Sequence, residues 1–206
     1  MMNEKRLIIL ARTLSLLFTP FYLPLMGMLA LFVFSYLNML PWQYKLQVVG
    51  ITYLFTILLP TMSIHWYHRY NGWTLWHLRE KDKRMVPYVI SIMSYLACFT
   101  LMKYLHMPHF MSAIVVAALF VQIVCALINI WVKVSTHMAA IGGITGGLLA
   151  FSFIFGYNPV WWLSMLIILS GLVGTARMIM RVHTLTEICA GYIRGMITTF
   201  IVVILI

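Results

Sequence analysis

Acidic residues are scarce in this 206-residue sequence, which has four Asp and Glu against 14 Lys and Arg. Four carboxylates cannot supply the aspartate-rich cage that holds magnesium on a diphosphate group. Membrane prenyltransferases and CDP-alcohol transferases need such a set, so the composition excludes both classes. The net charge of +10 favours an anionic lipid headgroup or an anionic substrate as partner.

Polar stretches are also few, because 63% of the residues are hydrophobic, 9% are charged and the mean hydropathy is +0.97. A soluble domain of this size could not bury so much apolar surface. We therefore expect a membrane-embedded chain that does not bind nucleic acid. The predicted fold is all-α: a polytopic bundle of about six to seven transmembrane helices, forming a single domain over residues 1–206.

Cysteine is rare as well, and its placement excludes two kinds of site. Cys98, Cys125 and Cys189 each lie inside an apolar run, and none belongs to a CxxC motif. We interpret all three as small core residues without a redox or zinc-binding role, and we expect neither a metal nor a cofactor.

Apolar runs of roughly 20 residues mark the expected spans. They lie at about 14–37, 45–66, 86–105, 110–132, 138–157, 160–176 and 185–206. The first run is too long for the apolar core of a cleavable signal peptide and lacks a small-residue cleavage site, so we expect a retained span. The "GGITGG" segment at 142–147 has small residues at helical spacing, which predicts close helix packing.

Seven spans would place the amino terminus and the loops after spans two, four and six on one side of the membrane. Most of the Lys and Arg residues lie on that side, and the positive-inside rule would make it cytoplasmic. We expect the chain in a bacterial inner membrane. Alternatively, several of these cations hold a substrate. Their distribution would then not indicate which side of the membrane is cytoplasmic.

Three segments on this side contain the unusual residues. The first, "REKDKRMVPY" at 79–88, is a dense cation cluster that could equally be a solvated juxtamembrane patch. The second, "KVSTHMAAIGG" at 133–143, places Ser135 and His137 at the start of a helix, where free N–H groups bind anions. His137 could equally be a residue of the membrane interface.

The third segment, "ARMIMRVHTLTEICAG" at 176–191, contains Arg177, His183 and Glu187. An acid in an apolar helix is costly and usually functional, and the four-residue spacing places Glu187 and His183 on one helix face if the helix has begun at His183. A carboxylate that accepts from one imidazole nitrogen fixes the tautomer and raises the basicity of the other, which makes His183 a candidate nucleophile. The alternative is a buried structural ion pair.

The third segment resembles the last signature of the type-2 phosphatidic acid phosphatase superfamily, which includes lipid phosphate phosphatases and vanadium haloperoxidases. That signature reads S-R-x5-H-x3-D, and this chain has A-R-x5-H-x3-E at 176–187. V-S-T-H at 134–137 is similar to the P-S-G-H motif. The cations at 79–84 resemble a diverged K-x6-R-P motif. The three motifs follow the family order and cover residues 79–191.

The resemblance implies a phosphatase-type core with its active site at one membrane interface. In that site His183 would attack phosphorus and form a phosphohistidine, Glu187 would orient His183, and His137 would protonate the leaving alkoxide. The phosphate would be held by polar and cationic residues: Arg177, Ser135, Thr136, Lys83, Arg84 and Lys133.

The sequence thus predicts a metal-independent phosphatase whose substrate is a lipid phosphate or an isoprenoid diphosphate with its tail in the bilayer. Two alternatives stay open. One is a phosphatase-like membrane protein without activity, and the other is a small transporter or scaffold that binds anionic lipid. Arg194, within the last predicted span, and the glycine-rich fifth span favour a transporter. The placement of the polar residues at span ends favours the hydrolase, because transporters hold their substrates near the midplane.

Overall fold

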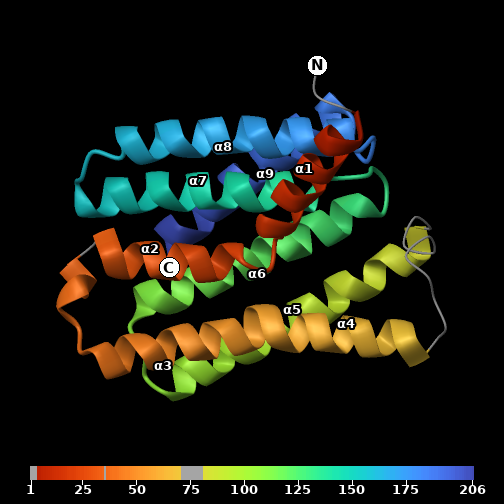
Figure 1. The fold of residues 1–206 in the computed structure, drawn as a ribbon. Coiled ribbons are helices and arrows are strands. Elements are labelled where there is room, and N and C mark those ends of the chain that lie inside the picture. Colours follow the sequence, from red (N-terminus) through yellow and green to blue (C-terminus); the bar gives the residue numbers. More distant parts are fainter. Residues whose placement is uncertain (1–3, 35, 71–80) are drawn as a thin grey trace.

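The computed structural model describes residues 4–34, 36–70 and 81–206 (Figure 1). All regular elements of these residues are helical, which confirms the predicted all-α class. In chain order they are α1 (Glu4–Leu17), α2 (Leu23–Phe34), the 3-10 helix η1 (Tyr36–Met39), α3 (Trp42–Tyr53), the π-helical turn η2 (Leu54–Leu58), α4 (Leu59–Tyr70), α5 (Lys81–Tyr104), α6 (His109–Asn129), α7 (Thr136–Phe155), α8 (Val160–Ile179) and α9 (Leu185–Leu205).

Among the described residues, six helical segments are long and apolar enough to cross a membrane. They are Trp42–Tyr67, Met85–Tyr104, His109–Asn129, Thr136–Phe155, Val160–Ile179 and Leu185–Leu205. Twenty helical residues extend about 30 Å, which matches the hydrocarbon thickness of a bilayer. The chain is therefore a polytopic membrane protein with about six spans.

The first predicted span, at about 14–37, is wrong as a single helix. The helix α1 ends at Leu17 and α2 begins at Leu23, so the helix is interrupted at residues 18–22, which include Pro20. Proline lacks the N–H that an uninterrupted helix needs, which explains the break. The 12 residues of α2 extend about 18 Å, too short to span the hydrocarbon core alone.

The connections alternate between the two ends of the bundle (Figure 1). The α6–α7 and α8–α9 connections lie at one end, which we call the site end, and the start of α5 lies at the same end. The α5–α6 and α7–α8 connections lie at the opposite end. This alternation brings residues 130–135 and 180–184 together although they are far apart in the sequence.

Helices α7 and α9 approach so closely that their backbones are in contact. A Cβ atom on Gly142 would lie 2.0 Å from the carbonyl oxygen of Tyr192, and one on Gly195 would lie 1.8 Å from that of Ala139. The close packing predicted for the "GGITGG" segment is confirmed. We call this contact the glycine seam, formed by Gly142 and Gly146 of α7 and by Gly191 and Gly195 of α9.

Helix α8 packs on α7 and α1 and touches α9 only slightly. Its buried side facing α7 is centred on Val173, which joins a small core with Met138 and Ile188. Leu14 and Phe18, from the end of α1, pack against the same core. Helix α1 is thus packed against α8 and α9 near the connection that joins these two helices.

Candidate active site

Helix α9 begins with a complete capping box. The N-cap residue Thr184 has an extended backbone, and its hydroxyl oxygen accepts from the backbone N–H of Glu187 at 3.4 Å. The carboxylate of Glu187 accepts in return from the backbone N–H of Thr184, also at 3.4 Å. This reciprocal pair fixes the Glu187 side chain at the helix N-terminus, where the helix dipole favours a negative charge.

His183 precedes this cap, and its Nδ1 lies 2.7 Å from Oε2 of Glu187. The predicted contact is present, but the helix has not begun at His183: α9 begins at Leu185, so the pair does not share a helix face. Glu187 instead reaches back across the cap. With Glu187 ionised, Nδ1 donates the proton and Nε2 is the basic nitrogen of the neutral ring.

A sharp turn at the end of α8 directs the chain back toward α9. Arg181 has a left-handed backbone with φ 53°, and the N–H of Val182 donates to the carbonyl of Arg177 at 3.2 Å. This is the hydrogen-bond pattern of a Schellman helix end, which a non-glycine residue adopts only with strain. The turn exposes the carbonyl of Val182, which accepts from the ammonium group of Lys133 in the α6–α7 connection.

The environment of His183 holds its imidazole neutral. Burial lowers the pKa of His183, and the nearby cations Arg177 and Lys133 lower it further. The hydrogen bond and charge of Glu187 raise this pKa, but the net shift is downward. The histidine side chain has 6% of its surface exposed. A buried, neutral and oriented imidazole has the properties of a nucleophile or general base.

The start of α7 offers donors that its own helix does not use. Ser135 is the N-cap residue and is completely buried, yet its hydroxyl makes no cap hydrogen bond. The hydroxyl oxygen of Ser135 and the Nδ1 atom of His137 have no hydrogen-bond partner among the described residues. Gly191 allows α9 to approach this turn, because a Cβ there would lie 2.8 Å from the carbonyl oxygen of Ser135.

Arg177 connects the site to α1. Its Nη1 donates to the hydroxyl of Ser15 at 3.0 Å, while its buried Nε atom has no partner among the described residues. The ring of His137 is hydrogen-bonded to the backbone of Ser15 and lies within electrostatic reach of Arg177 and His183. Sequence reasoning missed Ser15, because a single serine in an apolar helix shows nothing unusual.

The structure therefore brings most of the predicted site residues to one place at the site end. Lys133, Ser135, His137, Arg177, His183 and Glu187 meet there, and Thr136 is the first residue of α7. Lys83 and Arg84 lie in the first turn of α5, but their side chains, like residues 71–80, lie outside what the structure describes. No group of three or more potential metal-ligating side chains occurs in the described part of the chain.

The unpartnered groups define what this place can bind. Five buried side-chain atoms of the described residues lack a hydrogen-bond partner, and three of them belong to Ser135, His137 and Arg177. An unsatisfied buried polar atom costs about 1–3 kcal/mol, so three at one site favour the binding of a polar ligand or water there. The Ser135 hydroxyl and the Arg177 Nε–H can donate, which suits a ligand with acceptor oxygens, and Nδ1 of His137 becomes a third donor when its ring is protonated.

Comparisons with known proteins do not identify the chain: no family model, no curated protein and no solved structure matches it.

Proposed function

We propose that the protein is a phosphatase of the bacterial inner membrane that hydrolyses a lipid phosphate or an isoprenoid diphosphate. One observation supports the proposal most strongly. A neutral histidine oriented by a carboxylate lies beside three buried, unpartnered polar groups, all at one end of a membrane bundle. A phosphoryl group has the acceptor oxygens for those groups and the electrophilic phosphorus for that histidine. The motif resemblance at 134–137 and 176–187 points to the same chemistry.

In the proposed reaction, Nε2 of His183 attacks phosphorus in line with the leaving alkoxide. Glu187 holds the proton on Nδ1 and stabilises the positive charge that develops on the ring. Arg177, Lys133, the Ser135 hydroxyl and the free N–H groups of α7 stabilise the equatorial oxygens.

His137 has the place of the general acid that protonates the leaving alkoxide, which completes the release of the lipid alcohol. A water molecule then attacks the phosphohistidine and releases inorganic phosphate, with His137 now accepting the proton.

The test is phosphate release by the purified protein in detergent, with a panel of lipid phosphates and isoprenoid diphosphates and with a chelator present. Wild-type protein should release phosphate, and His183→Ala should lower the rate by at least about 1,000-fold, because the nucleophile is lost. His137→Ala should lower it by about 100-fold. His109→Ala, an exposed histidine at the opposite end, is the matched control and should keep the wild-type rate.

Two results would contradict the proposal. A full rate in the His183→Ala protein would remove the nucleophile assignment. Wild-type protein that releases no phosphate from any member of the panel would favour the inactive or transporting membrane protein instead. A transport measurement with the same lipids in vesicles would then separate these two alternatives, since both bind lipid without cleaving it but only a transporter moves it across the bilayer.

A further inference from the structure

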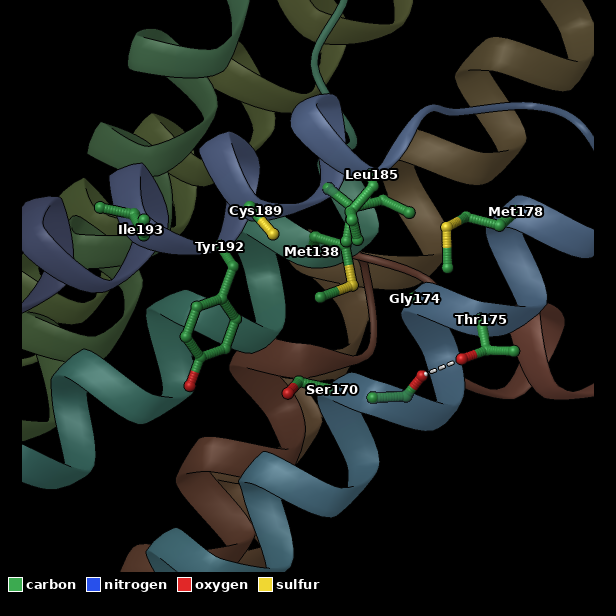
Figure 2. Close-up of a pocket in the computed structure, with 11 residues that line it drawn as sticks. Met138, Ser170, Gly174, Thr175, Met178, Leu185, Cys189, Tyr192 and Ile193 are labelled. Atoms are coloured by element: carbon green, nitrogen blue, oxygen red, sulfur yellow. Dashed lines mark hydrogen bonds between the residues drawn. The ribbon is translucent and has the colours of Figure 1, made fainter.

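A pocket of about 350 Å³ opens between α8 and α9, where the two helices stand apart (Figure 2). Met138 of α7 lies between the two walls as the floor. On α8 the lining extends from Ser170 to Met178, and on α9 it extends from Leu185 to Ile193. Each wall is therefore about 12 Å long, at 1.5 Å per helical residue.

The hydroxyl groups that line this pocket all donate to the protein itself. Ser170 donates to the carbonyl of Ile167 at 2.7 Å, and Thr175 donates to that of Gly171 at 2.8 Å. The Tyr192 hydroxyl donates to Thr145 on α7 at 3.1 Å. With these donors in use, methyl, methylene, sulfur and ring surfaces remain to meet an occupant. The pocket therefore suits a hydrocarbon and not a polar ligand.

Three residues that line the pocket directly follow residues of the candidate active site in the sequence, so the two lie close together. Met138 follows His137, Met178 follows Arg177, and Ile188 follows Glu187. Three helix ends are therefore shared by the site and the pocket: the first turn of α7, the last turn of α8 and the first turn of α9. Each of them contributes one polar residue to the site and the next, apolar residue to the pocket. A molecule with a phosphate at His183 therefore has an apolar volume close by.

The pocket is also open to the surface that α8 and α9 present to the bilayer. Leu185 and Ile193, at the two ends of the α9 wall, are 61% and 49% exposed. A lipid could thus enter sideways from the membrane, without its tail passing through water. Because the volume lies between only two helices and above one floor residue, we expect it to admit one chain and not a pair of chains.

We propose that this pocket binds the hydrocarbon tail of the phosphorylated lipid that is hydrolysed at His183, and that it selects lipids with a single chain. The inference rests on the proposed function and deepens it by naming the substrate class. The occupant is the substrate itself, held by its phosphate at the site end and by its tail between α8 and α9.

The core position expected for all three cysteines is wrong for Cys189, which lies on the open side of the pocket and is exposed, whereas Cys98 and Cys125 are buried. Cys189 therefore offers a direct test of occupancy. A long-chain alkyl phosphonate, which cannot be hydrolysed at its P–C bond, should slow maleimide labelling of Cys189 in detergent by about 10-fold. Inorganic phosphate and the alkyl alcohol of equal length are the controls and should not protect. Equal protection by the alcohol would overturn the proposal, because the pocket would then be a general lipid groove.

Gly171→Leu tests selection by the tail. Gly171 lines the pocket, and a Cβ atom there meets no other atom within 4 Å, so this position has room for a larger side chain that would reduce the pocket volume. The variant should lower hydrolysis of a hexadecyl phosphate by about 10-fold or more and leave that of butyl phosphate unchanged. Gly50→Leu is the matched control, since Gly50 on α3 is equally unobstructed but lies outside the pocket, and it should keep both rates.

The outcomes separate this inference from the proposed function. If Gly171→Leu keeps the hexadecyl phosphate rate, or loses both rates equally, the tail pocket is wrong while the phosphatase stands. If a two-chain phosphatidate is hydrolysed better than the single-chain substrate, the claimed selectivity is wrong. If wild-type protein cleaves neither phosphate, the proposed function fails, and the Cys189 labelling still decides whether the pocket holds the tail of a phosphonate lipid.

Discussion

Helix α9 has two neighbours that it meets in opposite ways. Against α7 its backbone is in contact, because glycines on both helices remove every intervening side chain. Against α8 it leaves a cavity, although α8 also carries Gly171 and Gly174. The difference shows that glycine in a membrane helix can serve either to join two backbones or to leave space beside one.

The two interfaces suit two different tasks. The glycine seam extends to Gly191, which lies against the carbonyl of Ser135, so it fixes the starts of α7 and α9 relative to each other. In the proposed reaction His137 and His183 depend on that fixed distance, because phosphoryl transfer needs its acid and its nucleophile on opposite sides of one phosphorus atom. The looser α8–α9 interface has no such geometric demand and can admit a lipid tail.

The largest expected effect comes from breaking the seam. Gly195→Ala places a Cβ atom 1.8 Å from the carbonyl oxygen of Ala139, so the helices must separate. We expect a loss of about 3 kcal/mol or more in the free energy of unfolding, the upper range for overpacking. Thermal unfolding in detergent measures it. Gly171→Ala, where nothing lies within 4 Å, is the control and should be neutral or slightly stabilising. Equal stability of the two variants would contradict the account of the seam.

A second effect concerns the carboxylate at the start of α9. Glu187→Gln removes the charge that orients His183 but keeps the size of the side chain, so kcat should fall by about 100-fold with little change in KM. Glu187→Asp keeps the charge and should retain more activity than the glutamine variant. A glutamine variant with wild-type kcat would show that the pair is only structural.

The pH dependence offers a third test. The cation Lys133 lowers the pKa of His183, and His183 must be neutral to attack phosphorus. Lys133→Met should therefore raise the pKa of His183, and kcat should be lost at a higher pH on acidification than in wild-type protein. The pH profile of kcat measures this shift. Lys103→Met, an exposed lysine near the opposite end, is the control. If the loss of kcat at acidic pH occurs at the same pH as in wild-type protein, or at a lower pH, the role of Lys133 in lowering the pKa of His183 is contradicted.

The smallest expected effect lies at the contact between α1 and α8. Ser15→Ala removes the acceptor of the Arg177 hydrogen bond, which should lower stability by about 1 kcal/mol. Thr13→Ala is the control, because the Thr13 hydroxyl is exposed and bonds only within its own helix. Thermal unfolding of the two variants gives the difference. Identical unfolding temperatures would show that α1 is not fixed by this hydrogen bond.

Sequence reasoning located the spans and the acid–base pair, because both leave local signals. Runs of about 20 apolar residues predict helices, and one acid in an apolar segment is conspicuous. The prediction of the first span as one helix was wrong because it relied on the length of the apolar run and gave too little weight to Pro20, near which the helix is interrupted. The His183–Glu187 contact was expected from helix periodicity but arises from the cap, since the exact start of α9 depends on Thr184.

The remaining features depend on distances that the sequence does not contain. Ser15 and Arg177 are 162 residues apart, and they meet only because α1 lies on α8. The tail pocket depends on how far α8 stands from α9, which local propensities do not determine. The "GGITGG" segment predicted a close contact, but the partners of Gly142 and Gly146, the carbonyls of Tyr192 and Met196, followed from the structure.

The central claim is that His183 accepts the phosphoryl group, and trapping the covalent intermediate tests it most directly. Purified protein would be mixed with a phosphorus-32-labelled lipid phosphate and quenched in alkaline detergent, which preserves phosphohistidine. We predict label that resists base, is released by acid, maps to the peptide with His183, and is absent from the His183→Ala protein. Steady release of phosphate without any covalent label, or label on another residue, would contradict the account.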